Sequence, residues 1–257
     1  MGHPLLDLTN KTAVVIGGTT GIGLALTRAL AEAGADTIPS SRRQEQVQAA
    51  CEVVKSFGRR TLAQTCDVKD RQSIEQLFKS ACSEFGSVQI LVNCAGKTKR
   101  TPTLEVSEEE WQDIMETNLT GIMRACQVFG KHMVEQRYGR IINIASLSSF
   151  VALYEVTAYC ASKAAVASLT RSLAIEWAQY GVCVNAIAPG VFRTDLNTKL
   201  LDSERGREFL VRSPMRRFGK VEELGGAAVF LASEAASFVT GQVLAVDGGF
   251  LASGVNQ

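Results

Sequence analysis

The sequence has almost no net charge and no long apolar run. Its 257 residues carry 27 Lys and Arg against 26 Asp and Glu, which gives a net charge of +1. Such a balance gives no reason to expect nucleic acid or an anionic membrane as a partner. No segment approaches the roughly 18 apolar residues of a spanning helix. The first residues, MGHPLLDLTN, also lack the basic start of a secretory signal.

Paired cysteines and histidine clusters are also missing. The seven cysteines are scattered and never form a C-x-x-C pair, and the only histidines are His3 and His132. We therefore expect reduced, mostly buried thiols in a cytoplasmic protein, and no metal site. The chain has no repeat or linker and is long enough for one large core, so we expect a single domain over residues 1–257.

Short apolar segments alternate with longer helical patterns along the chain. Strands that are apolar throughout and separated by helices indicate a parallel sheet covered on both faces. Right-handed crossovers then give a three-layer, doubly wound α/β fold. Pro39 cannot donate to a sheet ladder, so we place it among the last residues of the second strand. The expected strands are 12–18, 35–41, 60–68, 88–96, 139–146, 183–190 and 242–249, with helices over 21–34, 44–58, 71–86, from Ser107 onward, and over 159–181.

A glycine-rich stretch, IGGTTGIG, joins the first strand to the first helix. Gly17, Gly21 and Gly23 follow the spacing G-x-x-x-G-x-G. Missing side chains let the main chain approach a pyrophosphate, and the helix N-terminus offers N–H groups and a positive dipole end. A tight strand-to-helix turn is the alternative interpretation. The strand–loop–helix setting favours nucleotide binding.

The carboxyl end of the second strand indicates which dinucleotide would bind. An acid there holds the ribose hydroxyls of NAD, whereas an arginine accommodates the 2′-phosphate of NADP. Ser41 and Arg42 stand at this end, and Asp36 lies at the opposite end of the strand. We therefore expect NADP, with NAD possible, unless Arg42 is only a solvated residue at a helix start. Asp67, after the third strand, could accept from the adenine amino group or merely form a turn.

The sequence YCASK places Tyr159 and Lys163 four residues apart, on one face of a helix. An ammonium about 4 Å away stabilises a phenolate by about 4 kcal/mol at an effective dielectric near 20. That lowers the phenol pKa from about 10 toward 7. Such a pair exchanges a proton near neutral pH, as carbonyl reduction or alcohol oxidation requires. The alternative is an exposed pair of helix residues.

Two further polar residues fit the same chemistry. Ser146 ends the fifth strand at the ligand-binding edge of the sheet, where its hydroxyl would bond the reacting oxygen. Asn118 lies within a helical pattern that asparagine suits poorly. We expect it to distort the helix and hold a water that relays protons to Lys163. Their alternatives are a strand-terminating serine and a helix-surface amide.

Together these residues resemble the short-chain dehydrogenase/reductase family of the kind with one Rossmann-type domain. The resemblance covers nearly the whole chain. One departure is Ile16, where the family usually has a threonine that braces the turn. The absence of this threonine bears on the rigidity of the glycine loop more than on cofactor binding. The matching features are the glycine loop, Asp67, NCAG (93–96), Asn118, Ser146, Tyr159 with Lys163, PGVFRT (189–194) and VDGG (246–249).

The resemblance implies a role for each residue. Tyr159 is the acid/base, Lys163 lowers its pKa and holds the nicotinamide ribose, Ser146 orients the substrate oxygen, and Asn118 anchors the water. It also implies a seven-stranded sheet in the order 3-2-1-4-5-6-7, a mobile lid around 192–215, and a homotetramer or homodimer paired through 107–136 and 158–180. The implied cofactor contacts are Gly17, Thr19, Thr20, Gly21, Ile22, Gly23, Ser41, Arg42, Asp67, Val68, Asn93, Ala95, Gly96, Tyr159, Lys163, Pro189, Gly190, Val191 and Thr194.

Polar residues near the expected entrance of the site indicate the class of substrate. Lys97, Lys99 and Arg100 follow the fourth strand, and basic groups there suit a sugar, polyol or sugar acid. The segments GVFRTDL and VRSPMRRFGKVEELGGAAVFLAS are similar to those of gluconate and related sugar-acid dehydrogenases. The expected substrate contacts are Arg100, Ser148, Tyr154, Glu155 and Phe192.

Four alternatives stay open. The basic residues could be solvated or meet another subunit. A 3-oxoacyl-[acyl-carrier-protein] reductase would use a basic mouth to receive an acidic carrier. A cofactor-binding regulator would lack catalysis, and a metal-dependent alcohol dehydrogenase would lose activity to a chelator.

Overall fold

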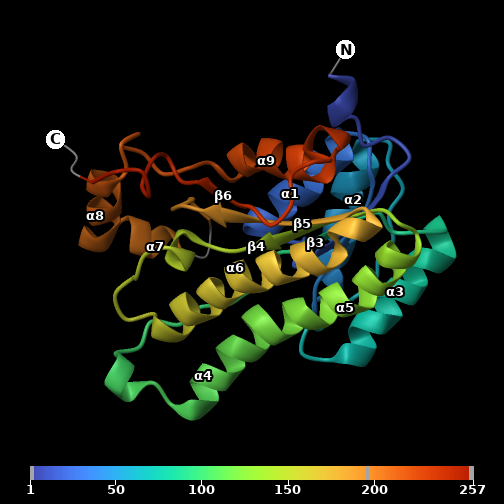
Figure 1. Cartoon of the computed structure of the whole chain (residues 1–257). Coiled ribbons are helices and arrows are strands. Elements are labelled where there is room, and N and C mark those ends of the chain that lie inside the picture. Colours follow the sequence, from blue (N-terminus) through green and yellow to red (C-terminus); the bar gives the residue numbers. More distant parts are fainter. Residues whose placement is uncertain (1–2, 195–196, 255–257) are drawn as a thin grey trace.

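A computed structural model describes residues 3–194 and 197–254. Among these residues, six parallel strands form one sheet between layers of helices (Figure 1). The strand order is β2-β1-β3-β4-β5-β6, and every neighbouring pair is parallel. This is the α/β Rossmann-like architecture that the alternating pattern predicts. The strands are β1 (Thr12–Ile16), β2 (Asp36–Ser40), β3 (Ile90–Asn93), β4 (Gly139–Ile144), β5 (Val182–Pro189) and β6 (Val243–Val246).

The predicted strand over 60–68 is wrong, and so is the seven-stranded order. The segment runs beside β2 and forms two main-chain hydrogen bonds with β2 and the residue after it: the Thr37 N–H donates to the Arg60 carbonyl (3.1 Å), and the Cys66 N–H donates to the Ser41 carbonyl (3.0 Å). Between these two points Pro39 has no N–H to donate, and the Gln64 N–H bonds to Leu62 within its own segment (3.2 Å). The ladder is interrupted there, so the sheet ends at β2.

Helices cover both faces of the sheet (Figure 1). One apolar layer packs α1 and α9 on the sheet through residues such as Leu26, Leu30 and Leu231, and the other packs α3, α5 and α6 through residues such as Leu77 and Phe129. The helices are α1 (Gly21–Glu32), α2 (Gln44–Ser56), α3 (Arg71–Phe85), α4 (Glu108–Met115), α5 (Gly121–Glu135), α6 (Thr157–Trp177), α7 (Thr198–Leu201), α8 (Glu204–Arg212) and α9 (Gly225–Ala232).

Helix ends follow the predicted signals. Ser107 caps α4 by accepting from the Glu110 N–H (3.2 Å), and the first turn holds three glutamates. After α6, Gly181 adopts a φ of 76°, which stops the helical chain before β5. All seven cysteines are free thiols, as expected. Among the described residues, none of the helices is long and apolar enough to cross a membrane.

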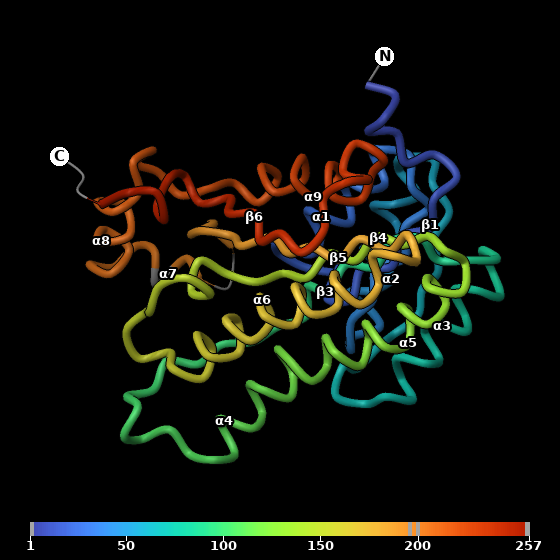
Figure 2. The backbone as a smooth tube through the Cα atoms, in the orientation of Figure 1, coloured from blue at the N-terminus to red at the C-terminus, as the bar shows by residue number. Residues whose placement is uncertain are grey.

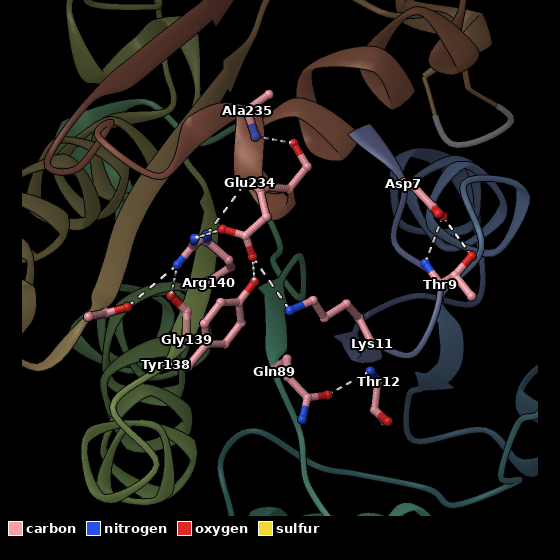
Figure 3. A network of polar contacts seen from close by, with 12 residues as sticks. Asp7, Thr9, Lys11, Thr12, Gln89, Tyr138, Gly139, Arg140, Glu234 and Ala235 are labelled. Atoms are coloured by element: carbon pink, nitrogen blue, oxygen red, sulfur yellow. Dashed lines mark hydrogen bonds and ion pairs between the residues drawn. The ribbon is translucent and has the colours of Figure 1, made fainter. Parts of the chain in front are cut away.

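A network of hydrogen bonds and ion pairs joins segments at the amino-terminal edge of the sheet, where β1 and β4 begin (Figure 3). Glu234 accepts from the Tyr138 hydroxyl (2.7 Å), from Arg140 (3.2 Å) and from Lys11 (3.5 Å). The Arg140 side chain is only 4% exposed, whereas Glu234 is 43% exposed. Glu234 therefore neutralises a buried cation and ties the chain after α9 to β4 and to the residue before β1.

We expect Glu234→Gln to lower the free energy of unfolding by about 1–3 kcal/mol at pH 7, because Arg140 loses its carboxylate partner. Burial raises the pKa of the Glu234 carboxyl, but the Tyr138 hydroxyl and the charges of Arg140 and Lys11 outweigh it and hold the pKa below its usual value. The pKa of Glu234 is therefore lower in the folded protein than in the unfolded chain, where it is near 4.5. The carboxylate stabilises the fold above pH 4.5, and this stabilisation is lost as the pH falls through the pKa of the folded protein. Urea unfolding at pH 7 and below pH 4 measures this difference.

The matched control is Glu52→Gln, which removes an exposed pair with Lys55 (2.8 Å). We expect that change to stay within about 0.5 kcal/mol at either pH. An equal effect of the two substitutions at pH 7 would show that the Glu234 network contributes nothing specific.

Candidate active site

The loops after β1 and β3 meet two helical segments at the carboxyl edge of the sheet. A Cβ on Gly17 would lie 2.5 Å from the Ala95 nitrogen, so the glycine loop touches the segment after β3. A Cβ on Gly96 would lie 3.5 Å from both Asn118 Oδ1 and Lys163 Nζ. The fold thus brings the predicted cofactor loop and predicted catalytic residues to one place.

The glycine loop is folded so tightly that side chains have no room. Gly17 has a φ of 82°, and its N–H donates to the Ser40 carbonyl (2.7 Å). A Cβ on Gly23 would lie 1.9 Å from the Gly17 carbonyl oxygen. The fully buried Thr27 on α1 donates its hydroxyl to the Gly18 carbonyl (2.9 Å). Thr27 thereby braces the turn in which Ile16 replaces the family's usual threonine.

The N-terminus of α1 fits a phosphate group. The N-cap residue Thr20 makes no side-chain hydrogen bond to the helix. The N–H groups of Gly21, Ile22 and Gly23 find no acceptor among the described residues. Unpaired N–H groups at a helix start, together with the positive end of its dipole, favour an anion. On the far side, a Cβ on Gly21 would lie 3.6 Å from Thr194 Cγ2, so Thr194 faces the loop.

The residues after β2 fit a second phosphate beside this loop. Thr19 bonds Ser41 through their hydroxyls (3.0 Å), which joins the glycine loop to the end of β2. Arg42 is exposed and forms no ion pair with any described residue. Asp36 accepts from the Arg60 N–H (2.9 Å) at the other end of the strand. Asp67 accepts from the Lys69 N–H (3.0 Å), which makes it a turn residue in this structure, and the neighbouring Val68 is buried against Gly121.

Ser146, Tyr159 and Lys163 lie together beside the end of β4. Ser146 caps the 3₁₀ turn Leu147–Ser149 by accepting from the Ser148 N–H (3.1 Å), and its side chain lies close enough to the Tyr159 phenol to act on the pKa of that phenol. Lys163 is 4% exposed and donates to the Ile144 carbonyl (2.6 Å). Its Nζ is 5.8 Å from the centre of the Tyr159 ring. The side chains of Ser146, Tyr159 and Lys163 therefore form one polar group beside the end of β4.

The electrostatics differ from the sequence-based expectation. Burial raises the pKa of the Tyr159 phenol, and the hydrogen bond from Ser146 opposes this only in part. Burial also lowers the pKa of the Lys163 ammonium to about 8. The predicted lowering of the Tyr159 pKa by Lys163 is therefore wrong for the protein alone. The amine bonds the Ile144 carbonyl, and its desolvation weakens the charge that was expected to act on the phenol.

Asn118 lies in a π-helical segment, Glu116–Thr120, between α4 and α5. Its fully buried side chain accepts from the Lys97 N–H (2.8 Å) and donates to the Lys97 carbonyl (2.8 Å) and to Ser162 (3.1 Å). The helix is distorted as predicted, and the surface-amide alternative is wrong. Asn118 fixes the loop after β3 against the start of α6.

A buried amide network beneath the site was not foreseen. Asn93 donates to Asn143 (2.9 Å), and Asn143 donates to Thr170 on α6 (3.0 Å). The Asn93 side chain thus points into the core, which leaves only its backbone for a cofactor. The signal was available in the sequence: an asparagine inside the apolar segment IINI, at position 143, needs a buried partner.

The basic residues at the site mouth are already paired. Lys97 bonds Asp113, Lys99 bonds Glu110 (2.6 Å) and Arg100 bonds Glu155 (2.5 Å). The predicted basic mouth is therefore largely neutralised by carboxylates. Glu155 holds a φ of 60°, a left-handed conformation that is strained for a residue with a side chain.

The remaining substrate candidates differ in their surroundings. Phe192 is 5% exposed and packs in the core against Gly219. Tyr154 is 75% exposed on the loop before α6. Ser148 is 4% exposed, and its hydroxyl has no hydrogen-bond partner among the described residues.

The predicted cofactor contacts after β5 lie where the chain leaves the sheet. Pro189 ends β5, and a Cβ on Gly190 would lie 2.6 Å from Asp247 Cα, so the chain carrying Val191 leaves the sheet beside Asp247.

Comparison with known proteins places this site in a family. A family profile described as "Enoyl-(Acyl carrier protein) reductase" matches residues 17–251. The chain belongs to the short-chain dehydrogenase/reductase family. It is 38% identical to a gluconate 5-dehydrogenase of Gluconobacter oxydans (strain 621H), over 98% of this chain and 100% of that protein.

Two further relatives are similar over nearly their whole length. A 2-dehydro-3-deoxy-D-gluconate 5-dehydrogenase of Bacillus subtilis (strain 168) is 43% identical, over 97% of this chain and 98% of that protein. The crystal structure of a gluconate 5-dehydrogenase from Burkholderia cenocepacia J2315, in complex with NADP and tartrate, is 36% identical. It matches with a TM-score of 0.93 over 97% of this chain and 98% of that one.

Proposed function

We propose that the protein is an NADP(H)-dependent oxidoreductase that interconverts a secondary alcohol and a carbonyl on a sugar acid. The observation that carries this proposal is the grouping of Ser146, Tyr159 and Lys163 beside Gly96 and the glycine loop. Relatives that share the fold over their full length are named for oxidation of gluconate or 2-dehydro-3-deoxygluconate at carbon 5. One solved relative holds NADP.

The reaction assigns one task to each side chain. The bound nicotinamide supplies or accepts the hydride. During reduction Tyr159 donates its hydroxyl proton to the carbonyl oxygen, and the raised pKa keeps the phenol protonated and ready to donate. Ser146 donates to the same oxygen and holds it in place. Lys163 lies beside Gly96, where it would bind the ribose next to the nicotinamide, and Asn118 keeps that loop in position.

The cofactor would lie across the carboxyl edge of the sheet. The N–H groups of Gly21, Ile22 and Gly23 would hold the pyrophosphate. Ser41 and Arg42 would hold the 2′-phosphate that distinguishes NADP from NAD. Asp67 and Val68 would border the adenine, and Val191 and Thr194 the nicotinamide amide.

Arg42→Gln is expected to raise the KM for NADPH at least about tenfold, because a charge-assisted hydrogen bond to phosphate contributes about 1.5–3 kcal/mol. The KM for NADH should stay unchanged and serves as the internal control. Steady-state rates with each cofactor at fixed substrate measure this. Equal changes with both cofactors, or none, would remove Arg42 from the cofactor site.

The substrate class is tested by initial rates at 340 nm. We expect NADP⁺ reduction with gluconate or 2-dehydro-3-deoxygluconate that exceeds, in kcat/KM, the NADPH oxidation seen with a 3-oxoacyl thioester. Turnover of the thioester alone would favour the acyl-carrier-protein reductase alternative. Binding of NADPH without turnover of any substrate would favour a cofactor-binding regulator, and loss of turnover with EDTA would favour a metal-dependent enzyme.

Further proposals concern the whole molecule. We infer one domain over the chain, with a lid in the segment 192–215. Residues 195 and 196 of that segment lie outside the described residues. We also infer assembly into homodimers or homotetramers in the cytoplasm, for which Ile175 on α6, 83% exposed, offers apolar surface.

A further inference from the structure

Most basic side chains around the site mouth, among the residues that the structure describes, are already paired with carboxylates. Lys97, Lys99 and Arg100 are bound to carboxylates on α4 and on the loop before α6. Beyond β5, Arg193 is bound to Asp202 (3.0 Å). At each of these four positions a carboxylate already balances the charge of the cation, so a substrate carboxylate would meet a neutral pair there.

Arg205 on α8 differs from these residues. Its guanidinium donates to the Tyr154 carbonyl (2.8 Å) and lies 6.0 Å from the Phe209 ring, and it forms no ion pair with a described residue. A guanidinium has five N–H donors, so one bond to a carbonyl leaves the planar fork able to take a carboxylate.

The position of Arg205 relates it to the reacting groups. Tyr154 lies on the loop that joins the turn after Ser146 to the helix that carries Tyr159. α8 follows the chain that leaves β5 (Figure 2). The Arg205–Tyr154 bond therefore joins the chain that follows β5 to the loop between Ser146 and Tyr159, both of which leave the carboxyl edge of the sheet.

A second, independent feature in this region points to a polar ligand. The Ser148 hydroxyl is buried within the turn after Ser146 and has no partner among the described residues. A buried hydroxyl without a partner costs free energy, which a substrate hydroxyl would recover. Ser148 thus offers a hydroxyl contact in the turn after Ser146, and Arg205 offers a carboxylate contact at the loop that follows this turn.

We propose that Arg205 is the specificity residue that binds the carboxylate of the sugar acid and so selects it over a neutral sugar. The assignment rests on the proposed function. It places the carboxylate at α8, the chain hydroxyls near Ser148 and the reacting carbon at Tyr159. Because Arg205 reaches across from α8, binding of the carboxylate would also hold α8 against the loop before α6.

The test compares a sugar acid with its neutral isostere. We expect the wild-type kcat/KM for gluconate to exceed that for gluconamide by at least about tenfold, as expected for a hydrogen bond between charged groups. Arg205→Gln should bring this ratio close to one, mainly through the KM for gluconate, with the KM for NADP⁺ unchanged. Arg205→Lys, which keeps the charge without the fork, should fall between the two.

The matched control is Arg207→Gln. Arg207 is exposed on the same helix, two residues farther on and therefore on another face, and its change removes the same charge. We expect that variant to keep the wild-type ratio. Calorimetry of gluconate binding to the NADPH complex, which has no hydride acceptor for gluconate, gives a second readout that does not depend on turnover.

The outcomes separate the two proposals. Equal losses for gluconate and gluconamide in Arg205→Gln would show that Arg205 only supports α8 and would overturn the assignment. A wild-type ratio near one, or a ratio unchanged by the substitution, would overturn it as well while leaving the proposed reaction intact. Absence of any wild-type turnover or binding of sugar acids would instead reject the proposed function, and this assignment with it.

Discussion

Tyr159→Phe is expected to lower kcat by about 10²- to 10⁴-fold, which is the usual contribution of a positioned general acid or base. The substitution removes the phenol hydroxyl and leaves the half-buried ring and its neighbours in place. NADPH binding, followed by the fluorescence of the nicotinamide, should change less than about threefold. The large loss should therefore appear in kcat and not in cofactor affinity.

Tyr180→Phe makes the same chemical change just beyond the far end of the same helix and is the control. We expect it to keep wild-type kcat. If Tyr159→Phe also kept wild-type kcat, the proton would come from another group, and Ser146 would be the next candidate because it bonds the same position.

Gly23→Ala is expected to weaken NADPH binding at least about 100-fold. The new Cβ would lie 1.9 Å from the Gly17 carbonyl oxygen, which is backbone and cannot rotate away. The start of α1 must therefore move from the turn, and the N–H groups aimed at the pyrophosphate lose their common direction. Fluorescence titration with NADPH measures the affinity, and circular dichroism with thermal unfolding shows whether the rest of the fold persists.

Gly226→Ala is the control for a glycine-to-alanine change in a helix. No atom lies within 4 Å of a Cβ placed there, so we expect normal binding and a stability gain of up to about 1 kcal/mol. Wild-type NADPH affinity in a folded Gly23→Ala protein would contradict the role given to the glycine loop.

Much of the fold could be predicted because apolar runs and glycines report local structure directly. The pattern from Thr12 to Gly23 predicted β1, the turn and the start of α1, with element ends within about two residues of those observed. The strand over 60–68 failed because its pairing depended on a neighbour: Pro39 in β2 offers no N–H, and Gln64 turned back to its own segment. Apolar pattern alone does not reveal whether an adjacent strand can supply hydrogen bonds.

The site was predictable in its residues but not in its electrostatics. The spacing of Tyr159 and Lys163 placed both side chains correctly on α6, yet burial, which raises one pKa and lowers the other, depends on the surrounding fold. The pairing of Lys97 with Asp113 and of Arg100 with Glu155 is likewise set by tertiary structure. Thr27 and Asn143 were missed because a lone polar residue in an apolar pattern shows no partner until the chain is folded.

A crystal structure of the protein with NADP⁺ and a sugar acid tests the central claim most directly. We expect the pyrophosphate at the N-terminus of α1 and the 2′-phosphate at Arg42. The reacting oxygen should lie within hydrogen-bond distance of both Ser146 and Tyr159, and the reacting carbon about 3–3.5 Å from nicotinamide C4. A dinucleotide bound elsewhere, or a nicotinamide ring facing away from Tyr159, would contradict the account.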